Sequence, residues 1–524
     1  MTSPKIVLTS PATEMSDYKK SPFIAFSASF SKPGFIPRCF LLKTLYTPVP
    51  KLDNYEVLYA PYGLRKIEAA LIEYGFSEEE VAVVHPDDLD KVVGPETKVI
   101  AVSSMDPLGI AFVSITYSTL IGLGESMTAY EFKKLSEKWM KYKPKVKIVV
   151  GGAGSWQLAK KKMMEKYGVD VVIIGEGEKI VGELFSKLIE GKPVEKVVYG
   201  TPASADEIPC IKRAAVHGVV EITRGCGRGC QFCSPTMQVR RCMPLDRVVK
   251  EVKVNVEAGQ DFILVATDDL FLYGCNSPDF KPNGEKILKV LKAIASIKGV
   301  KYIQPAHSAL PPVLLDKKLV KEISELLLQY SYYSYRNKTI VTTEVGIETG
   351  STRLIAKYMA GKPKPFKPED WPRVVLDSIA TMNEYDWYPL ATIITGLPGE
   401  TEEDVIQTLE LLDELSSLKL FIVPLFFVPE ETCYLKNGPE TSFEHLSELQ
   451  KEIFIKCWKY NIGEWGLTFF SKYSSNSIKK LFLKIAVKAS LSILYTLSYA
   501  KKDSWRKRAF KEISSEIINV LKAL

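Results

Sequence analysis

Three cysteines lie close together in the stretch TRGCGRGCQFC, residues 223–233. Cys226, Cys230 and Cys233 could supply three thiolates to a metal centre. A structural zinc site needs four ligands, usually two closely spaced pairs, and no second pair lies nearby in the sequence. A cubane iron–sulfur cluster has four irons, so three cysteines leave one iron open to an outside ligand. The spacing therefore predicts an iron–sulfur cluster with one free corner.

The rest of the composition indicates an ordinary globular protein of two or three domains. The chain has 524 residues, of which 46% are hydrophobic and 25% charged. The remaining cysteines are scattered without a disulfide framework, which indicates a reducing cytoplasm. We expect no secretory signal at the N-terminus, and no apolar run approaches the ~20 residues that a spanning helix needs.

Residues 1–195 alternate apolar strand-like runs with amphipathic helical patterns. The expected strands read KIVLTS, VAVVH, KVIAVSS, VKIVVGG and VDVVIIGEGE. Strands this apolar, separated by helices, predict a parallel sheet covered on both faces, that is, a Rossmann-like α/β domain. Glycines follow two of these strands, at the edge where open parallel sheets hold ligands.

A second alternation follows a predicted linker, residues 196–216, which has two prolines and little periodicity. Residues 217–430 contain six strand-then-helix units, which predict a complete or partial βα barrel. The cysteine triplet comes directly after the first strand of this barrel, at the end where barrel chemistry gathers. Residues 431–524 are predicted to form a helical C-terminal region.

The cysteine loop, with Phe232 just before its last cysteine, resembles that of the radical S-adenosylmethionine (SAM) superfamily. The resemblance implies a six-unit partial βα barrel and a 4Fe–4S cluster that binds SAM through its free iron. It also implies an external electron donor, whose electron splits SAM into methionine and a 5′-deoxyadenosyl radical. That radical removes a hydrogen atom from an unactivated C–H bond.

Three further stretches match this family in the expected order: TDDLF (267–271), GIETGS (346–351) and GLPGET (396–401). The resemblance implies that the first meets the ammonium group of SAM, the second its ribose hydroxyls and methionine carboxylate, and the third its adenine. A carboxylate suits vicinal hydroxyls because it accepts two hydrogen bonds at once. The residues expected to contact SAM are Phe232, Asp268, Asp269, Glu348, Ser351, Arg353 and Gly396.

The N-terminal domain resembles the cobalamin-binding domain that often precedes such barrels, with GGAGSW (151–156) and IIGEGE (173–178) in matching places. The resemblance implies that the corrin lies over the strand ends. The residues expected to contact it are Ser104, Leu108, Gly151, Gly152, Gly175, Glu176 and Gly177. The Asp-x-His-x-x-Gly motif is absent, since DPLGI (106–110) has no histidine. We therefore expect no histidine from that motif below cobalt, and we interpret His85 as an ordinary surface residue.

Within the superfamily, the sequence looks most like archaeal glycerol dialkyl glycerol tetraether (GDGT) ring synthases. The similar stretches include YEVLYAPYGLRKIEAALIEYGF, SSMDPLGI and GIETGSTRLIAKYMAGK. This resemblance implies a membrane lipid as substrate and cyclopentane rings as product. The alternatives are a cobalamin-dependent radical methyltransferase acting on a peptide, natural product or cofactor, and a tRNA-modifying enzyme.

A basic segment near the C-terminus fits a membrane partner. Residues 471–524 carry 12 basic and 3 acidic residues, although the whole chain has a net charge of only +7. In residues 478–502, Lys480, Lys484 and Lys488 recur every four positions among aliphatic residues. This pattern predicts a helix that lies on an anionic membrane surface, or else a helix packed on the barrel with a solvated edge. We expect a cytoplasmic enzyme peripherally associated with the inner face of the membrane, with no nucleic acid as partner.

Overall fold

The computed structural model describes residues 3–20, 25–32, 36–121, 124–235, 238–439, 441–472 and 504–523. The predicted amphipathic segment 478–502 lies outside these ranges. Within the described part of the chain, no helix has the length and apolar character needed to cross a membrane.

The N-terminal domain is built on a parallel sheet with the strand order β2-β1-β3-β4-β5-β6. Its strands are β1 (Ile6–Thr9), β2 (Val81–Val83), β3 (Val99–Ser103), β4 (Lys147–Gly151), β5 (Val171–Ile174) and β6 (Val197–Tyr199). Side chains alternate between the two faces, so Val99 and Ala101 pack in one apolar layer and Ile100 and Val102 in the other. This sheet confirms the Rossmann-like prediction.

Helices cover both faces of this sheet. Apolar side chains of α3 (Tyr62–Tyr74) and α8 (Val181–Ile189) fill one layer. Those of α6 (Met127–Trp139) and α7 (Lys161–Tyr167) fill the other. Burial on both faces explains why the strands read as continuous apolar runs rather than as alternating patterns.

Strand β6 lies in the stretch 196–216, for which the sequence predicts a linker. Val197, Val198 and Tyr199 pair with β5 at the edge of the sheet. Three residues are too few for their periodicity to identify a strand. The N-terminal sheet thus extends to residue 199, and the connection to the second domain is correspondingly shorter.

The second domain is a partial barrel of six parallel strands that follow one another in chain order. They are β7 (Val220–Glu221), β10 (Phe262–Ala266), β11 (Tyr302–Pro305), β14 (Glu344–Glu348), β15 (Leu390–Thr395) and β16 (Phe421–Phe426). The first three form one sheet and the last three another, and a parallel bridge between His307 and Glu344 joins them. These strands are the six predicted units.

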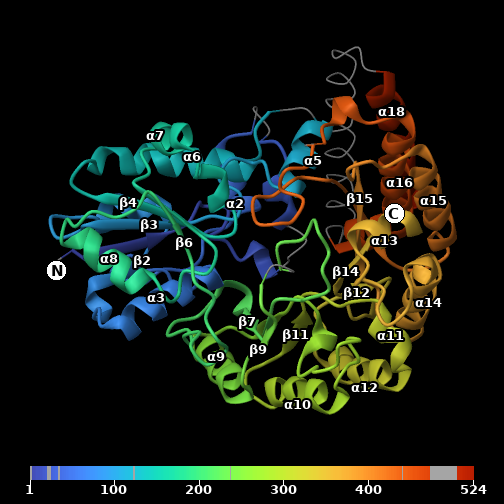
Figure 1. Cartoon of the computed structure of the whole chain (residues 1–524), viewed down its shortest axis with the longest axis horizontal. Helices are drawn as coiled ribbons and strands as arrows, with labels where there is room; N and C mark the ends of the chain where they lie inside the picture. The colour runs from blue at the N-terminus through green and yellow to red at the C-terminus, as the bar shows by residue number, and fades with distance from the viewer. Residues whose placement is uncertain are drawn as a thin grey trace.

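Helices surround the outside of the partial barrel (Figure 1). Those that follow the strands include α9 (Leu245–Glu257), α10 (Gly284–Ala295), α12 (Lys317–Leu327), α14 (Trp371–Glu384), α15 (Glu402–Leu415) and α16 (Glu448–Lys472). Helix α18 (Ser504–Ala523) packs beside α16. Its Trp505 also packs against Phe443, which precedes α16, at a ring-centroid distance of 5.0 Å. The C-terminal region is therefore helical where it is described.

The N-terminal domain contacts both edges of the open barrel. At one edge, helix α5 (Phe112–Ile121) lies along β16, where the Thr116 hydroxyl accepts a hydrogen bond of 2.8 Å from the Phe426 amide. At the other edge, the Tyr62 hydroxyl of α3 accepts from the Glu221 amide of β7, at 3.2 Å. The same hydroxyl donates to Glu251 of α9, at 2.7 Å. The two domains are therefore held together on both sides of the barrel mouth.

Candidate functional site

The cysteine loop is closed at its base by a short antiparallel hairpin. Strands β8 (Thr223–Arg224) and β9 (Arg241–Cys242) pair with each other, and the loop between them carries the three cysteines. The loop leaves the barrel directly after β7, at the carboxyl end of the strands. The amide of Gly225 donates a 2.6 Å hydrogen bond to the carboxylate of Asp268, which follows β10. The predicted cluster loop thus lies beside a predicted SAM contact.

None of the three cysteines of this loop forms a disulfide; Cys230 is buried, and Cys226 and Cys233 are partly buried. Burial raises the pKa of Cys226 to about 11 and also raises that of Cys230. Iron binding requires thiolates, so cluster assembly must displace these protons. In the described part of the chain, no three Cys, His, Asp or Glu side chains are already gathered around a metal position. The donor chemistry of the three cysteines fits an iron–sulfur cluster.

Arg228, between the first two cysteines, anchors this loop to the barrel. Its guanidinium pairs with Asp269 at 3.2 Å and donates to the backbone carbonyls of Lys362 and Lys364. It also lies 4.4 Å from the ring centre of Phe280. The sequence analysis did not identify this role, because none of these partners is local to Arg228.

The two adjacent aspartates after β10 have different environments. One oxygen of Asp269 accepts hydrogen bonds from the amides of Phe271 and Ala309, both at 3.0 Å, and the other accepts from Arg228. Both carboxylate oxygens of Asp269 are therefore used to hold the loop. Asp268 has the Gly225 amide as its partner, and burial raises its pKa. Asp268 is therefore the better placed of the two to meet an ammonium group.

Glu348 ends β14 with a backbone φ of 68°, which is uncommon for a residue with a side chain and turns the chain sharply. Its carboxylate pairs with Lys362 at 2.9 Å and accepts a 3.1 Å hydrogen bond from Thr392 of β15. Lys362 is a site residue that the sequence analysis missed. The charge of Lys362 also influences Cys230, whose pKa it lowers against the larger effect of burial. Lys362 thus pairs with Glu348 and also acts electrostatically on the cysteine loop.

The other residues expected to contact SAM lie at neighbouring strand ends. Ser351 caps helix α13 (Thr352–Tyr358) and donates to Asp404 of α15 at 2.5 Å. Arg353 pairs with the same carboxylate. Gly396 follows β15 with a φ of 84°, a conformation that favours glycine. Phe232 is half-buried against the barrel core.

Glycines shape the carboxyl edge of the N-terminal sheet. Gly151 ends β4, and Gly152 has a φ of 92° and lies so close to Ser104 that a Cβ would be 2.8 Å from its backbone. Gly175 follows β5 with a φ of 88°, and Gly177 comes two residues later. Ser104 donates to Glu14 at 2.8 Å. We call this edge the crest; it comprises Gly151, Gly152, Gly175, Gly177 and the loops that follow β1 and β3.

Two further crest residues, Leu108 and Glu176, have hydrogen-bond or ion-pair partners. The Leu108 amide donates to Gln157 at 2.8 Å. The side chain of Glu176 pairs with two arginines of the β8–β9 hairpin, Arg224 at 2.9 Å and Arg241 at 2.5 Å. These ion pairs cross between the domains and are largely buried. The carboxylate of Glu176 is thus committed to the base of the cysteine loop rather than exposed on the crest.

His85 is buried, which corrects its interpretation as a surface residue. It caps the turn after β2, where its Nδ1 accepts a 3.2 Å hydrogen bond from the Asp87 amide. Burial lowers its pKa to about 4. The residue was misjudged because a lone histidine in a sequence carries no information on its burial.

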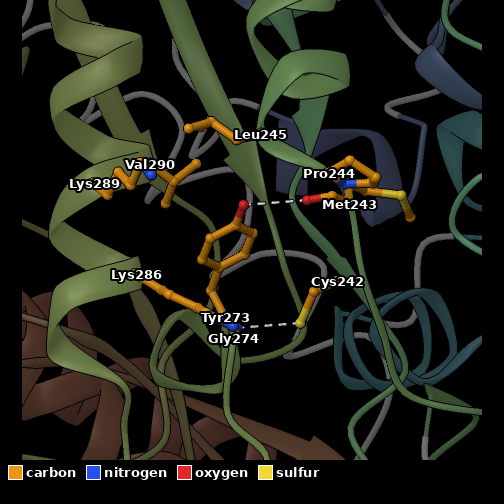
Figure 2. Close-up of a pocket in the computed structure, with 9 residues that line it drawn as sticks. All are labelled: Cys242, Met243, Pro244, Leu245, Tyr273, Gly274, Lys286, Lys289 and Val290. Atoms are coloured by element: carbon orange, nitrogen blue, oxygen red, sulfur yellow. Dashed lines mark hydrogen bonds between the residues drawn. The ribbon is translucent and has the colours of Figure 1, made fainter.

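A small cavity of about 280 Å³ lies on the outer flank of the hairpin (Figure 2). In this cavity the Tyr273 hydroxyl donates to the Met243 carbonyl at 3.1 Å, and the Gly274 amide donates to the Cys242 sulfur at 3.2 Å. Lys286 and Lys289 line its other side. None of the residues predicted to bind a cofactor lines this cavity.

Comparisons with known proteins agree with the geometry of the barrel. Residues 220–412 match the model of the radical SAM superfamily. This segment is a radical SAM domain. Its assignment implies a 4Fe–4S cluster and SAM as cofactors, the two that the cysteine loop predicts.

Curated relatives share about a quarter of the residues in the aligned part of the chain. The tRNA-2-methylthio-N(6)-dimethylallyladenosine synthase of Thermotoga petrophila is 25% identical over 54% of this chain and 60% of its own length. The ribosomal protein uS12 methylthiotransferase RimO of Carboxydothermus hydrogenoformans is 23% identical over 62% of this chain and 70% of its own. The chain thus spans less than two thirds of the first of these relatives.

A solved structure extends the similarity to most of the chain. The radical SAM methyltransferase TsrM from Kitasatospora setae matches with a TM-score of 0.51 at 15% identity, over 81% of this chain and 73% of that one. The match indicates a shared fold. It spans more of the chain than the radical SAM domain alone.

Proposed function

We propose that this chain is a cobalamin-dependent radical SAM enzyme that modifies an unactivated carbon, by methyl transfer or by carbon–carbon bond formation. The observation that carries the proposal is the placement of the crest against the barrel mouth, held there by Glu176 and the two hairpin arginines. A ligand on the crest would therefore meet a substrate next to the cysteine loop.

Buried polar atoms on the crest support cobalamin as that ligand. The hydroxyls of Ser10 and Thr13 and one carboxylate oxygen of Asp106 are buried without a hydrogen-bond partner in the described structure. Buried polar groups are normally paired, so three such atoms indicate a missing donor or acceptor. The amide groups around a corrin ring could pair with them, while Gly152 and Gly175 allow its close approach.

Each part of the site then has a defined task. When bound, the cluster and SAM supply the radical, and cobalamin supplies a carrier for the transferred group. The three cysteines hold the cluster, and Arg228 holds their loop. Asp268 and Glu348 would orient SAM.

The first test is replacement of Cys226, Cys230 and Cys233 together by alanine. We expect protein prepared without oxygen to lose both its iron and its conversion of SAM to 5′-deoxyadenosine, because no thiolate remains to hold the cluster. Cys39→Ala removes an exposed thiol outside the site and is the matched control. Cleavage of SAM by the triple variant would contradict the proposal, as would failure of the wild-type chain to retain added cobalamin.

We further propose ring formation in a membrane lipid as the specific reaction. Its support is the sequence resemblance and the basic segment 478–502, in which each lysine near an anionic surface adds on the order of 1 kcal/mol. Changing Lys480, Lys484 and Lys488 to glutamate should release the chain from phosphatidylserine vesicles while SAM cleavage in solution continues. Mass spectrometry of lipids from a host that supplies uncyclised tetraethers should detect rings. Unchanged vesicle binding would contradict the membrane role of the segment, and unaltered lipids would contradict ring formation.

A further inference from the structure

The segment that carries Lys362 is fixed to the cysteine loop on both sides of Cys230. The carbonyl of Lys362 accepts a 3.3 Å hydrogen bond from the Arg228 side chain. The carbonyl of Tyr358 accepts a 2.9 Å hydrogen bond from the Gln231 amide. These contacts involve a residue before and a residue after Cys230, so the backbone at Lys362 follows the loop closely.

The ammonium group of Lys362 reaches the end of β14, where it pairs with Glu348 at 2.9 Å. The two side chains are only 14% and 7% exposed. Gly346 makes room for this pair, because a Cβ in its place would be 2.6 Å from the Lys362 nitrogen and would overlap the Glu348 carboxylate. The ring centre of Trp371 lies 5.8 Å from the same nitrogen. The pair is therefore shielded from water, and its charges are weakly screened.

This ion pair directs its positive end towards the cysteines. Burial raises the pKa of Cys230, and among the nearby charges Lys362 lowers it more than Glu348 raises it. Burial opposes the positive charge of Lys362, yet Glu348, Cys230 and Cys233 together raise its pKa above the usual value. The ammonium group thus acts on the Cys230 sulfur more strongly than the carboxylate does.

A second buried ion pair at this loop has the opposite orientation. Arg228 pairs with Asp269 at 3.2 Å, and both side chains are buried. Burial raises the pKa of Cys226, and among the nearby charges Asp269 raises it more than Arg228 lowers it. At Cys230, the effect of Arg228 is also smaller than that of Lys362. Lys362 is therefore the cation with the larger effect on this thiol.

We propose that Lys362 raises the reduction potential of the cluster and that Glu348 lowers it. In the reduction step one electron passes from the external donor to the cluster, and no bond forms or breaks. The reduced cluster carries one more negative charge, so a buried cation beside its thiolates stabilises it relative to the oxidised cluster. A buried carboxylate has the reverse effect. This inference rests on the cluster of the proposed function and adds the two residues that govern its reduction.

A redox titration followed by electron paramagnetic resonance tests the proposal. The full chain is loaded with the cluster alone, because SAM and cobalamin would add charges of their own. Lys362→Met should lower the equilibrium constant for reduction at least tenfold, which is about 59 mV for one electron. Glu348→Gln should raise the potential, and the double variant should lie between the two single variants. Lys362→Arg keeps the charge and should retain most of the wild-type potential.

Lys364→Met is the matched control. The Lys364 carbonyl also accepts a hydrogen bond from Arg228, at 3.4 Å, but its side chain is exposed. Water therefore screens its charge, and the variant should keep the equilibrium constant within a factor of two of the wild type. If Lys362→Met does not assemble a cluster, Glu348→Gln decides the question, since removal of a negative charge must raise the potential.

Three results would overturn the proposal. They are an unchanged potential in Lys362→Met, an equally large shift in Lys364→Met, and shifts of the same sign in Lys362→Met and Glu348→Gln, which would indicate a displaced loop instead of a lost charge. The titration requires no turnover. A chain that shows the expected shifts but never cleaves SAM would disprove the proposed function, and the role of Lys362 would still stand.

Discussion

At the scale of single residues, the site depends on ion pairs that join segments far apart in the sequence. Glu348 was expected to meet the ribose of SAM, and in the structure it also neutralises Lys362. A lysine in this position compensates negative charge on the thiolates of the cysteine loop. Glu348 therefore holds Lys362 in addition to its proposed contact with SAM, and a substitution can separate the two roles.

Glu348→Gln should lower the affinity for SAM at least tenfold while iron content stays at the wild-type level. Glutamine keeps the shape of the side chain but accepts one hydrogen bond from a diol where a carboxylate accepts two. Equilibrium binding of SAM to the cluster-loaded protein measures the effect. Glu344→Gln is the control, because Glu344 begins the same strand and is partly exposed beside His307. An unchanged SAM affinity would leave Glu348 with the structural task alone.

At the scale of elements, the β8–β9 hairpin connects the cysteine loop to the crest. Arg224 and Arg241 stand on either side of the cysteine loop, and both pair with Glu176 after β5. Arg224 also pairs with Glu178 and Glu221, so a buried network surrounds the base of the loop. The position of the cysteine loop is thus linked to the crest.

Glu176→Gln should destabilise this connection. It leaves Arg241 buried without an anionic partner, and breaking a buried pair on one side costs roughly 3–5 kcal/mol. Denaturant unfolding should show the loss, and the electron paramagnetic resonance spectrum of the reduced cluster should change because its loop is displaced. Glu183→Gln on α8 removes an exposed carboxylate and should change neither. A stability within about 0.5 kcal/mol of the wild type would show that the network does not need Glu176.

At the scale of the whole molecule, the N-terminal domain covers an open edge of the partial barrel. A partial barrel leaves β16 as an edge strand with unpaired backbone groups, and such edges promote association. Helix α5 covers part of this edge through Thr116 and Tyr117, whose hydroxyl donates to the Pro424 carbonyl at 3.2 Å. Tyr117 is 3% exposed and packs edge-on against Trp458. The contact with α5 therefore shields part of the β16 edge from association with other chains.

Tyr117→Ala should uncouple the two domains. Loss of the buried ring is expected to cost roughly 3–5 kcal/mol, as for other large aromatic truncations. Tyr117→Phe, which loses only the hydrogen bond to Pro424, should cost about 1 kcal/mol. In scanning calorimetry the alanine variant should split into two transitions that the phenylalanine variant does not show. Identical traces for the two variants would contradict the role of α5 at this edge.

The sequence by itself predicted most of the elements and indicated the three cysteines that we propose as metal ligands. Apolar runs of strand length, separated by amphipathic helices, predicted both the Rossmann-like sheet and the six barrel units, because each pattern is local and repeats. Three cysteines on one short loop need no tertiary information to be recognised. Glycines at strand ends were likewise visible, since a left-handed backbone conformation selects them. The sequence did not predict the short strand β6, because three residues are too few to show the periodicity of a strand.

Only the tertiary structure decided which polar side chains remain available for ligands. Asp268 and Asp269 are neighbours in the sequence, yet Arg228 and two backbone amides occupy one of them. Glu176 looked like a cofactor contact until its arginine partners were placed beside it. Lys362 belongs to none of the motifs that the sequence analysis recognised. Burial and pairing depend on segments that are distant in the chain, so the free energy of a charged group, and with it its task, follows from the fold rather than from its neighbours in the sequence.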